Sequence, residues 1–324
     1  LFAFEEQPDT VIAARFHEIE SMRLGTEQNR EVADDMTQFF SLTRDGKDIP
    51  AILVYIGQKW RPEKRRKKLS SIDFYRVLGV QMCNAIKKLR DMGHTEATIV
   101  LPGRFHPRHL KKDPHGEQEE DIFVRTLVES MVTTNSPDAN KASPRPTIAK
   151  ICFTHFGDHQ QTATHFFNRA IGAGLEIGNA VQEARELTKL PPDDKVPLLF
   201  AERLCRTNIL LRSVSLPDWR TVKNHGYGSS VKAQLIYGVE GLRRAGFGLI
   251  AAVGQGSRDE PCFLKLHYRP KNTGEGMKKV VAIGKGVIMD TGGLSLKTEG
   301  SMNKMHYDMA GAATVASAFR LAAE

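Results

Sequence analysis

Short apolar runs of strand length alternate with longer amphipathic runs through the first half of the chain. In order, these runs are AILVYIG at 51–57, SSIDFYRVLGVQMCNAIKKLR at 70–90, ATIVLP at 97–102, DIFVRTLVESMV at 121–132 and TIAKICFTHF at 147–156. A chain that goes from strand to helix and back is typical of an α/β layer, because each helix connects two neighbouring parallel strands. The alternation therefore predicts an α/β domain with parallel pairing.

A long helix is predicted where this first domain ends. Residues 163–189 place apolar side chains near helical spacing without a proline, and Pro191-Pro192 then stops the helix. At 324 residues the chain exceeds one average domain, so two domains are expected. We predict an N-terminal α/β domain at 1–162, a linker helix at 163–190 and a second α/β domain at 191–324.

The second half also reads as α/β. Its expected elements are a helix at 198–207, tight turns at Gly246, Gly248, Gly254 and Gly256, strands at 262–268 and 279–289, and a helix at 310–324. The last helix runs to Glu324 with no cap, glycine or proline after it, whereas a domain usually ends on such a signal. We therefore expect the second domain to be incomplete in this sequence.

The composition is that of an ordinary folded protein. Hydrophobic residues make up 40% and charged residues 26% of the chain, a balance that disordered proteins do not have. The four cysteines are scattered without a CxxC pair, which argues against a disulfide framework or a zinc knuckle and favours a reducing compartment. No apolar run approaches the roughly 18 residues that a membrane helix needs, so no membrane partner is expected.

One stretch of the first half is strongly basic. Seven of the ten residues from Lys59 to Lys68 (KWRPEKRRKK) are lysine or arginine, and Trp60 adds an aromatic ring. Such a run can bind phosphates electrostatically. A solvated loop between two elements has the same composition, so both interpretations stay open.

The residues that suggest chemistry lie between the predicted strand at 279–289 and the final helix. Lys285, Asp290, Lys297 and Asp308 surround a Gly292-Gly293 pair that lets the backbone bend sharply. Ligands of α/β sheets bind beyond the carboxyl ends of the strands, which is where this loop is expected. Two carboxylates can bind a divalent cation, together with a lysine whose amine has lost its proton. A plain connection or an anion-binding turn fits the same composition.

Residues 284–314 resemble the signature of the leucyl (cytosol) aminopeptidase family. The segment GKGVIMDTGGLSLKTEGSMNKMHYDMAGAAT is similar to GKGxxFDSGGxSLKPxxxMxxMxxDMGGAA, the approximate pattern of that family. The four ionisable residues match without a gap, at successive spacings of five, seven and eleven residues. A weaker resemblance extends upstream to ARELTKLPPD at 184–193 and LIAAVGQGS at 249–257.

The resemblance implies a role for each matching residue. Lys285, Asp290 and Asp308 match metal ligands, with Asp290 as the carboxylate that bridges two metal ions. Lys297 matches the catalytic lysine that polarises the scissile carbonyl. Met305 matches a residue that lines the pocket for the N-terminal side chain of the substrate.

The resemblance also implies properties of the whole protein. The fold would be a macro-domain-like N-terminal α/β domain joined by a long helix to a catalytic α/β domain with a mixed sheet flanked by helices. The activity would be removal of leucine-like N-terminal residues from peptides with a free N-terminus, by a mechanism that uses two divalent ions, Mn²⁺ or Zn²⁺. The family implies a homo-hexamer and a cytoplasmic setting, with a mitochondrial one as the alternative.

One part of the family pattern is missing. The family supplies a further Asp and Glu as metal ligands from a later motif, NTDAEGR, and nothing similar occurs before Glu324. Either the sequence is part of a longer protein, or the chain is a degenerate relative that has lost the site. In the second case it would be a non-catalytic protein that binds nucleic acid or an assembly through its basic residues, which are Lys59 to Lys68 with Arg104, Arg108, Lys111 and Lys112.

Overall fold

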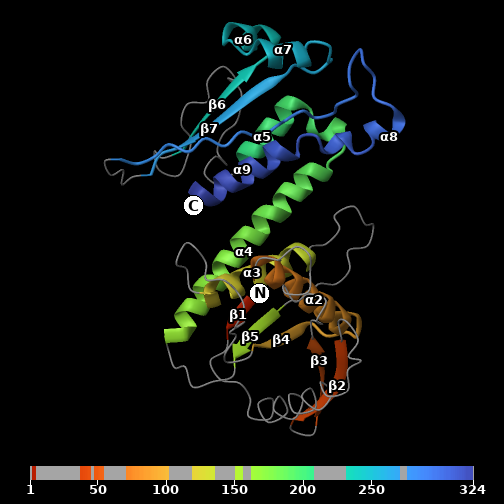
Figure 1. The fold of residues 1–324 in the computed structure, drawn as a ribbon, viewed down its shortest axis with the longest axis vertical. Helices are drawn as coiled ribbons and strands as arrows, with labels where there is room; N and C mark the ends of the chain where they lie inside the picture. The colour runs from red at the N-terminus through yellow and green to blue at the C-terminus, as the bar shows by residue number, and fades with distance from the viewer. Residues whose placement is uncertain are drawn as a thin grey trace. The chain divides into compact units, whose positions relative to one another are not determined.

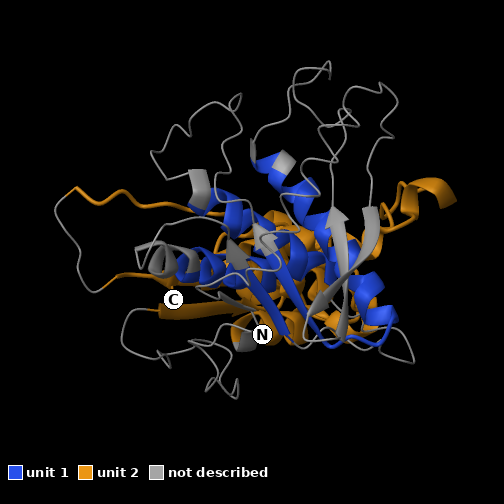
Figure 2. Cartoon of the chain, turned by 90° about the horizontal axis from the view of Figure 1, so that it is seen from below, with its two compact units in different colours: residues 1–179 blue, residues 180–324 orange. Residues whose placement is uncertain are grey.

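The computed structural model describes residues 2–4, 37–44, 47–54, 71–101, 119–135, 150–155, 162–207, 231–270 and 276–323. The chain falls into two compact units, Leu1–Asn179 and Ala180–Glu324, coloured blue and orange in Figure 2. The boundary between the units lies within helix α4 (Thr162–Lys189), which covers the range predicted for the long helix. The predicted domain limits stay a prediction, and the basic residues at 59–68 and 104–112 lie outside the described residues.

Unit 1 contains a parallel sheet with the order β1-β5-β4. Its strands are β1 (Phe2–Phe4), β4 (Glu96–Leu101) and β5 (Lys150–His155), and helix α3 (Glu119–Asn135) follows β4 and precedes β5. Helix α2 (Ser71–Asp91) leads into β4 and lies beside α3 on one face of the sheet (Figure 1). This arrangement confirms the predicted α/β layer for the segments from 70 to 156.

The strand predicted at 51–57 is placed differently. Strand β3 (Lys47–Val54) pairs antiparallel with β2 (Thr37–Arg44) in a separate two-stranded sheet, so the expected parallel pairing is wrong for this segment. Only Asp45 and Gly46 separate the two strands. A two-residue link cannot cross over to a parallel neighbour, whereas Asp-Gly is a favoured hairpin sequence.

Helix α3 lies at the centre of the hydrophobic core of unit 1. Leu127 and Val128 are fully buried, and Met131 and Val124 are nearly so. The core also takes residues from α2, α4 and the strands, among them Tyr75, which contacts Phe123 edge to face with ring centroids 5.0 Å apart. A helix that is apolar over most of its circumference needs neighbours on several sides, and α3 has them in α2, α4 and the sheet.

Glycines allow the three helices to approach one another closely. A Cβ atom at Gly174 of α4 would lie 2.5 Å from the Arg125 carbonyl oxygen, and one at Gly178 would lie 2.7 Å from the Val132 Cβ. On the other side of α3, a Cβ at Gly79 of α2 would lie 2.5 Å from the Ser130 Cβ. Real Cβ atoms do not occupy such positions, so the packing of α2 and α4 on α3 requires these glycines.

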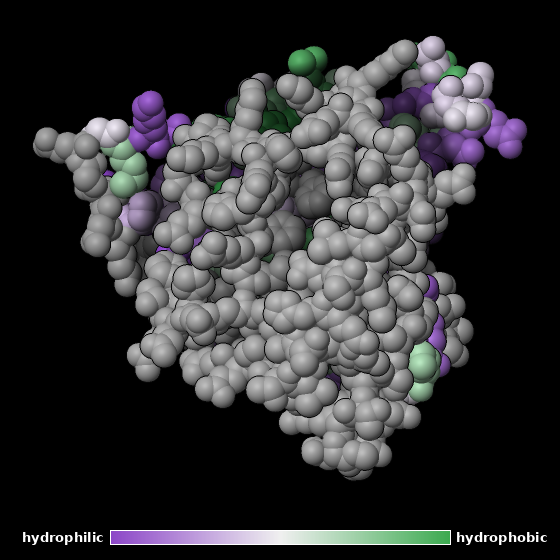
Figure 3. Space-filling model, turned by 60° about the horizontal axis from the view of Figure 1, so that its bottom comes forward, coloured by the Kyte–Doolittle hydropathy of each residue, from purple (hydrophilic) through white to green (hydrophobic). Residues whose placement is uncertain are grey.

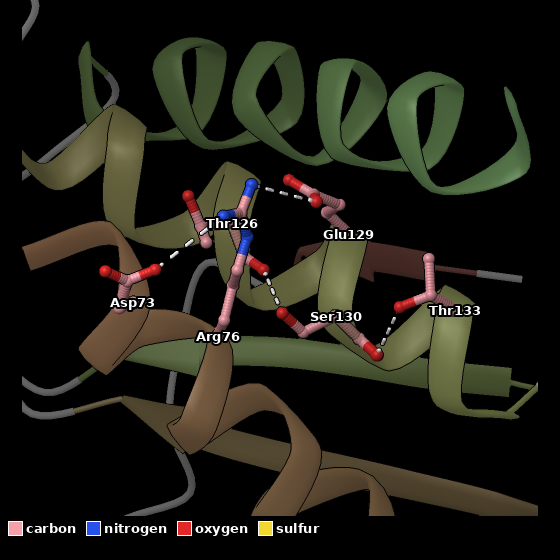
Figure 4. Close-up of polar contacts among 6 residues, drawn as sticks. All are labelled: Asp73, Arg76, Thr126, Glu129, Ser130 and Thr133. Atoms are coloured by element: carbon pink, nitrogen blue, oxygen red, sulfur yellow. Dashed lines mark hydrogen bonds and ion pairs between the residues drawn. The ribbon is translucent and has the colours of Figure 1, made fainter. Parts of the chain in front are cut away.

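Polar contacts accompany this packing (Figure 4). Arg76 on α2 lies 3.4 Å from the Glu129 carboxylate on α3 and 3.9 Å from that of Asp73 on its own helix. The Ser130 hydroxyl donates a 2.8 Å hydrogen bond to the Thr126 carbonyl. The Arg76 pairs are exposed, and each contributes little stability compared with the buried side chains.

The described residues of unit 2 form mostly short helices and one antiparallel strand pair. Its elements after α4 are η3 (Pro192–Lys195), α5 (Pro197–Thr207), β6 (Val231–Tyr237), α6 (Val239–Arg244), α7 (Gly248–Gly254), β7 (Cys262–Tyr268), α8 (Glu299–Met302), η5 (Met305–Tyr307) and α9 (Ala310–Ala323). The predicted helices at 198–207 and 310–324 and the strand at 262–268 are confirmed. Strand β6 and helices α6 and α7 were not predicted, and the expected mixed sheet is represented among the described residues only by β6 and β7.

The prediction of a strand at 279–289 is wrong. The segment forms no strand, and Val280, Val281 and Ile283 are 88%, 73% and 89% exposed. A strand requires a partner that satisfies its backbone groups, and the strands that the structure describes in unit 2 pair only with each other. Among the described residues visible in Figure 3, both hydrophobic (green) and hydrophilic (purple) ones lie at the surface. No helix in the described part of the chain is long and apolar enough to cross a membrane.

We expect Gly174→Ala and Gly178→Ala to lower the free energy of unfolding of unit 1, because each new methyl group would overlap α3. Overpacking of this kind costs about 1–3 kcal/mol. Gly172→Ala is the matched control, since a Cβ there meets no atom within 4 Å. Alanine in a helix interior is favoured over glycine by about 0.5–1 kcal/mol, so the control should be neutral or stabilising. Urea denaturation of the three variants measures this, and equal effects at all three positions would contradict the close packing.

Candidate metal centre

The backbone around Lys285 lies directly against the first turn of α9. The Ala312 N–H donates a 2.9 Å hydrogen bond to the Lys285 carbonyl oxygen. A Cβ at Gly284 would lie 2.5 Å from the Gly311 carbonyl oxygen, and one at Gly311 would lie 2.9 Å from the Lys285 nitrogen. The first N–H groups of a helix have no partner within the helix, so the Lys285 carbonyl satisfies one of them. Glycine is therefore needed on both sides of this contact.

This contact brings Lys285 to Asp308. The Lys285 Nζ lies 2.6 Å from the Asp308 Oδ2, with the lysine side chain 56% exposed and the aspartate 17% exposed. Asp308 directly follows η5, and α9 begins two residues later. Its Oδ2 is buried and accepts no hydrogen bond of good geometry from any described atom. A buried carboxylate oxygen with an ion-pair partner but no hydrogen bond is a position that a bound cation can occupy.

The loop after Asp290 folds back on itself. The Gly292 N–H donates to the Asp290 Oδ1 at 2.9 Å, and the Lys297 N–H donates to the Thr291 carbonyl at 2.9 Å. Gly292 has a φ of +91°, in the left-handed region, and a Cβ there would lie 2.9 Å from the Lys297 nitrogen. Both the backbone angle and the space therefore require glycine.

The folded loop places Lys297 between Asp290 and Met305. The Lys297 Nζ donates to the Asp290 Oδ2 at 2.9 Å and lies 3.4 Å from the Met305 Sδ. Both lysine and aspartate are partly shielded from solvent, at 26% and 33% exposure. The five residues that the sequence singled out thus form two ion pairs and a lysine–methionine contact, while their individual roles stay predictions.

The charges of the two lysines act together on Asp290. The hydrogen bond from Lys297 lowers the pKa of the Asp290 carboxyl most, and the Gly292 N–H lowers it further. The positive charges of Lys297 and Lys285 act in the same direction. Asp290 is therefore an ionised acceptor at neutral pH, and Lys285 is near enough to influence both carboxylates.

Sequence reasoning missed one residue that contacts this region. Lys195, at the end of η3, is fully buried, and its Nζ donates to the carbonyl oxygens of Thr188 and His306. Burial lowers the pKa of the Lys195 ammonium. In the sequence, Lys195 belongs to a polar PPDDK stretch that looks like an exposed turn. Nothing in that stretch marks the lysine as buried.

The residues present fit a divalent cation. No group of three or more His, Cys, Asp and Glu side chains gathers anywhere in the described part of the chain. The candidate set instead combines two carboxylates, Asp290 and Asp308, with the amine of Lys285. Carboxylate oxygens suit Mg²⁺, Ca²⁺ and Mn²⁺, and the buried Asp308 Oδ2 has the Lys285 ammonium as its ion-pair partner. A cation would replace the lysine proton as the partner of that oxygen.

Comparison with known proteins finds a family match and similar solved structures. Two of these structures are of the bottromycin maturation enzyme BotP, one of them in complex with Mn. The Mn complex has a TM-score of 0.57 and 21% sequence identity, and the match covers 98% of this chain and 55% of BotP. The second structure has a TM-score of 0.55 and 21% identity, with 98% and 54% covered. The likeness shows a common fold, and the chain spans about half the length of BotP.

The family match covers the whole of the candidate centre. Residues 182–324 match the catalytic domain of the cytosol aminopeptidase family. The matched range contains Lys285, Asp290, Lys297, Met305 and Asp308, so the resemblance read from their spacing is confirmed. Residues 182–324 therefore belong to the catalytic domain of the cytosol aminopeptidase family.

Proposed function

We propose that this protein is a metallo-aminopeptidase that removes N-terminal, leucine-like residues from peptides. The observation that carries the proposal is the pairing of Lys285 with Asp308 and of Lys297 with Asp290, within a range that matches a peptidase family. Two acidic and two basic side chains in one loop region provide ligands for a cation and a charge for a developing oxyanion. The BotP structure in complex with Mn supports Mn²⁺ as the ion to test first.

Three residues of the chain would hold a metal ion in the proposed centre. These are Lys285 through its deprotonated amine and Asp290 and Asp308 through their carboxylates. A bound divalent ion would lower the pKa of a coordinated water to roughly 7 and polarise a peptide carbonyl. Asp290 is prepared for this role because its hydrogen bonds keep it ionised.

Lys297 would act on the substrate itself. Its ammonium is held by the Asp290 carboxylate and lies against the Met305 sulfur, so it starts from a defined position. A positive charge held there can donate a hydrogen bond to the oxyanion that forms when water attacks the scissile carbonyl. Met305 offers an apolar side chain beside Lys297, which suits the side chain of an N-terminal leucine.

The alternative function is a non-catalytic protein that binds nucleic acid or an assembly. It rests on the basic run from Lys59 to Lys68, which lies outside the described residues. The activity measurement below decides between the two functions.

We expect Lys297→Met to lower kcat by about 10²–10³, the usual effect of removing one oxyanion donor. The assay is Mn²⁺-dependent release of leucine from leucine p-nitroanilide by the protein expressed from its complete gene. Lys279→Met is the matched control, because Lys279 is exposed and lies in the segment that precedes the site. Absence of activity with Mn²⁺ and Zn²⁺, or equal activity of Lys297→Met and the parent protein, would refute the proposed enzyme.

We expect Asp308→Asn to weaken Mn²⁺ binding at least tenfold, because a neutral amide replaces the charged oxygen that faces Lys285. Thermal unfolding with and without Mn²⁺ measures this, since a ligand at about 100 times its Kd stabilises the folded state by about 2.7 kcal/mol. The control is Asp193→Asn, which changes an exposed carboxylate in η3 of the same unit. If both variants gain the same stabilisation from Mn²⁺ as the parent, Asp308 is not a ligand.

A further inference from the structure

We infer that Lys195 is a positioning residue for the candidate metal centre, where its ammonium holds the turn that carries Met305 and Asp308 against the end of α4. The inference rests on the proposed function as far as the metal is concerned. The claim that Lys195 fixes this turn depends only on the contacts of Lys195 itself.

The first step is the burial of Lys195. Its side chain has no solvent exposure, which is rare for a lysine because a buried charge must find partners for its three N–H donors. The Nζ donates to the Thr188 carbonyl at 2.8 Å and to the His306 carbonyl at 2.6 Å, and lies 3.5 Å from the Met309 Sδ. The three acceptors account for all three donors.

The second step concerns the Thr188 carbonyl at the end of α4, to which the Lys195 ammonium donates. Thr188 is the second-last residue of α4, so its carbonyl is one of the four that an α-helix leaves without an intrahelical donor. The C-terminus of a helix also carries a partial negative charge, which favours a cation there. The Lys195 ammonium thus fits the end of α4 both as a hydrogen-bond donor and as a charge.

The third step is the part of the chain that Lys195 holds. His306 lies two residues before Asp308, and Met309 follows Asp308 directly, so the contacts of Lys195 lie on both sides of this residue. Met309 is itself fully buried and packs in the core cluster that joins α4, α5 and α9. Fixing the backbone on both sides of Asp308 sets where its carboxylate meets Lys285.

The same turn connects to the other ion pair. Met305 lies one residue before His306, and its Sδ is 3.4 Å from the Lys297 Nζ. Each end of the turn therefore contacts a lysine through a methionine sulfur, with Lys297 at Met305 and Lys195 at Met309. Loss of Lys195 would remove the donor to the His306 carbonyl, and the turn would have to move for this carbonyl to find another partner.

Hydrogen exchange of the metal-free protein tests the fixing of the turn. The reporting amides are those of Tyr307, Asp308 and Ala312, which donate to Lys304, Met305 and Lys285. We expect Lys195→Met to accelerate exchange in peptides covering 305–312 by about tenfold or more while β6 and β7 stay protected. Lys265→Met, the same change at an exposed position of β7, should leave exchange in 305–312 as it is in the parent.

Two results would overturn the inference. One is unchanged exchange in 305–312, and the other is a uniform acceleration that includes β6 and β7, which would mean that Lys195 only stabilises the unit as a whole. If Lys195→Met does not fold, Met309→Leu decides the question, because it removes one acceptor and keeps the apolar volume. A selective acceleration of a few fold in 305–312 supports the inference, and a uniform or absent effect contradicts it.

Mn²⁺ binding followed by electron paramagnetic resonance separates this inference from the proposed function. The six-line signal of free Mn²⁺ disappears on binding, and we expect about tenfold weaker binding by Lys195→Met and unchanged binding by Lys265→Met. If the parent binds Mn²⁺ and Lys195→Met binds it equally well, the positioning role fails. If the parent binds no Mn²⁺, the proposed function fails, while hydrogen exchange still decides whether Lys195 fixes the turn.

Discussion

The contact between the backbone at Gly284-Lys285 and the first turn of α9 is the constraint on which the candidate centre depends. One hydrogen bond, from the Ala312 N–H to the Lys285 carbonyl, joins two segments whose glycines leave no space for a side chain. Because both segments are fixed at this point, the Lys285 side chain begins close enough to Asp308 to form the ion pair. Gly284 and Gly311 therefore allow the two segments to approach closely, and the charged residues beside them are available for metal binding.

Opposite charges are paired throughout the candidate centre. Two carboxylates and two ammonium groups are arranged as neighbouring pairs, so the region holds its charges without burying any of them alone. The Lys285 amine stands in for a cation at the Asp308 carboxylate, and the Gly292 N–H with Lys297 keeps Asp290 ionised. A divalent ion that enters would exchange one positive partner for another, which requires less rearrangement than the creation of a new charged site.

Local patterns in the sequence predicted most of the described helices and pointed to the residues of the candidate centre, because both depend on spacing along the chain. The Pro191-Pro192 pair predicted the end of α4, and the unbroken spacing of four ionisable residues singled out the residues of the candidate centre. What depended on pairing partners was not predictable. Residues 279–289 have the composition of a strand but form none, and β3 pairs with β2 because only two residues separate them. Lys195 was missed because its partners, Thr188 and His306, come together only in the folded unit.

The central claim is that Lys285, Asp290 and Asp308 hold a divalent ion. Anomalous diffraction at the manganese absorption edge, from crystals of the protein grown with Mn²⁺, tests it most directly. We expect an anomalous peak within bonding distance of the Asp308 Oδ2, the Asp290 carboxylate and the Lys285 Nζ. Bonds to the metal would then replace the ion pair between Lys285 and Asp308. An unbroken ion pair between Lys285 and Asp308 without an anomalous peak beside it, at a Mn²⁺ concentration that loads other sites, would contradict it.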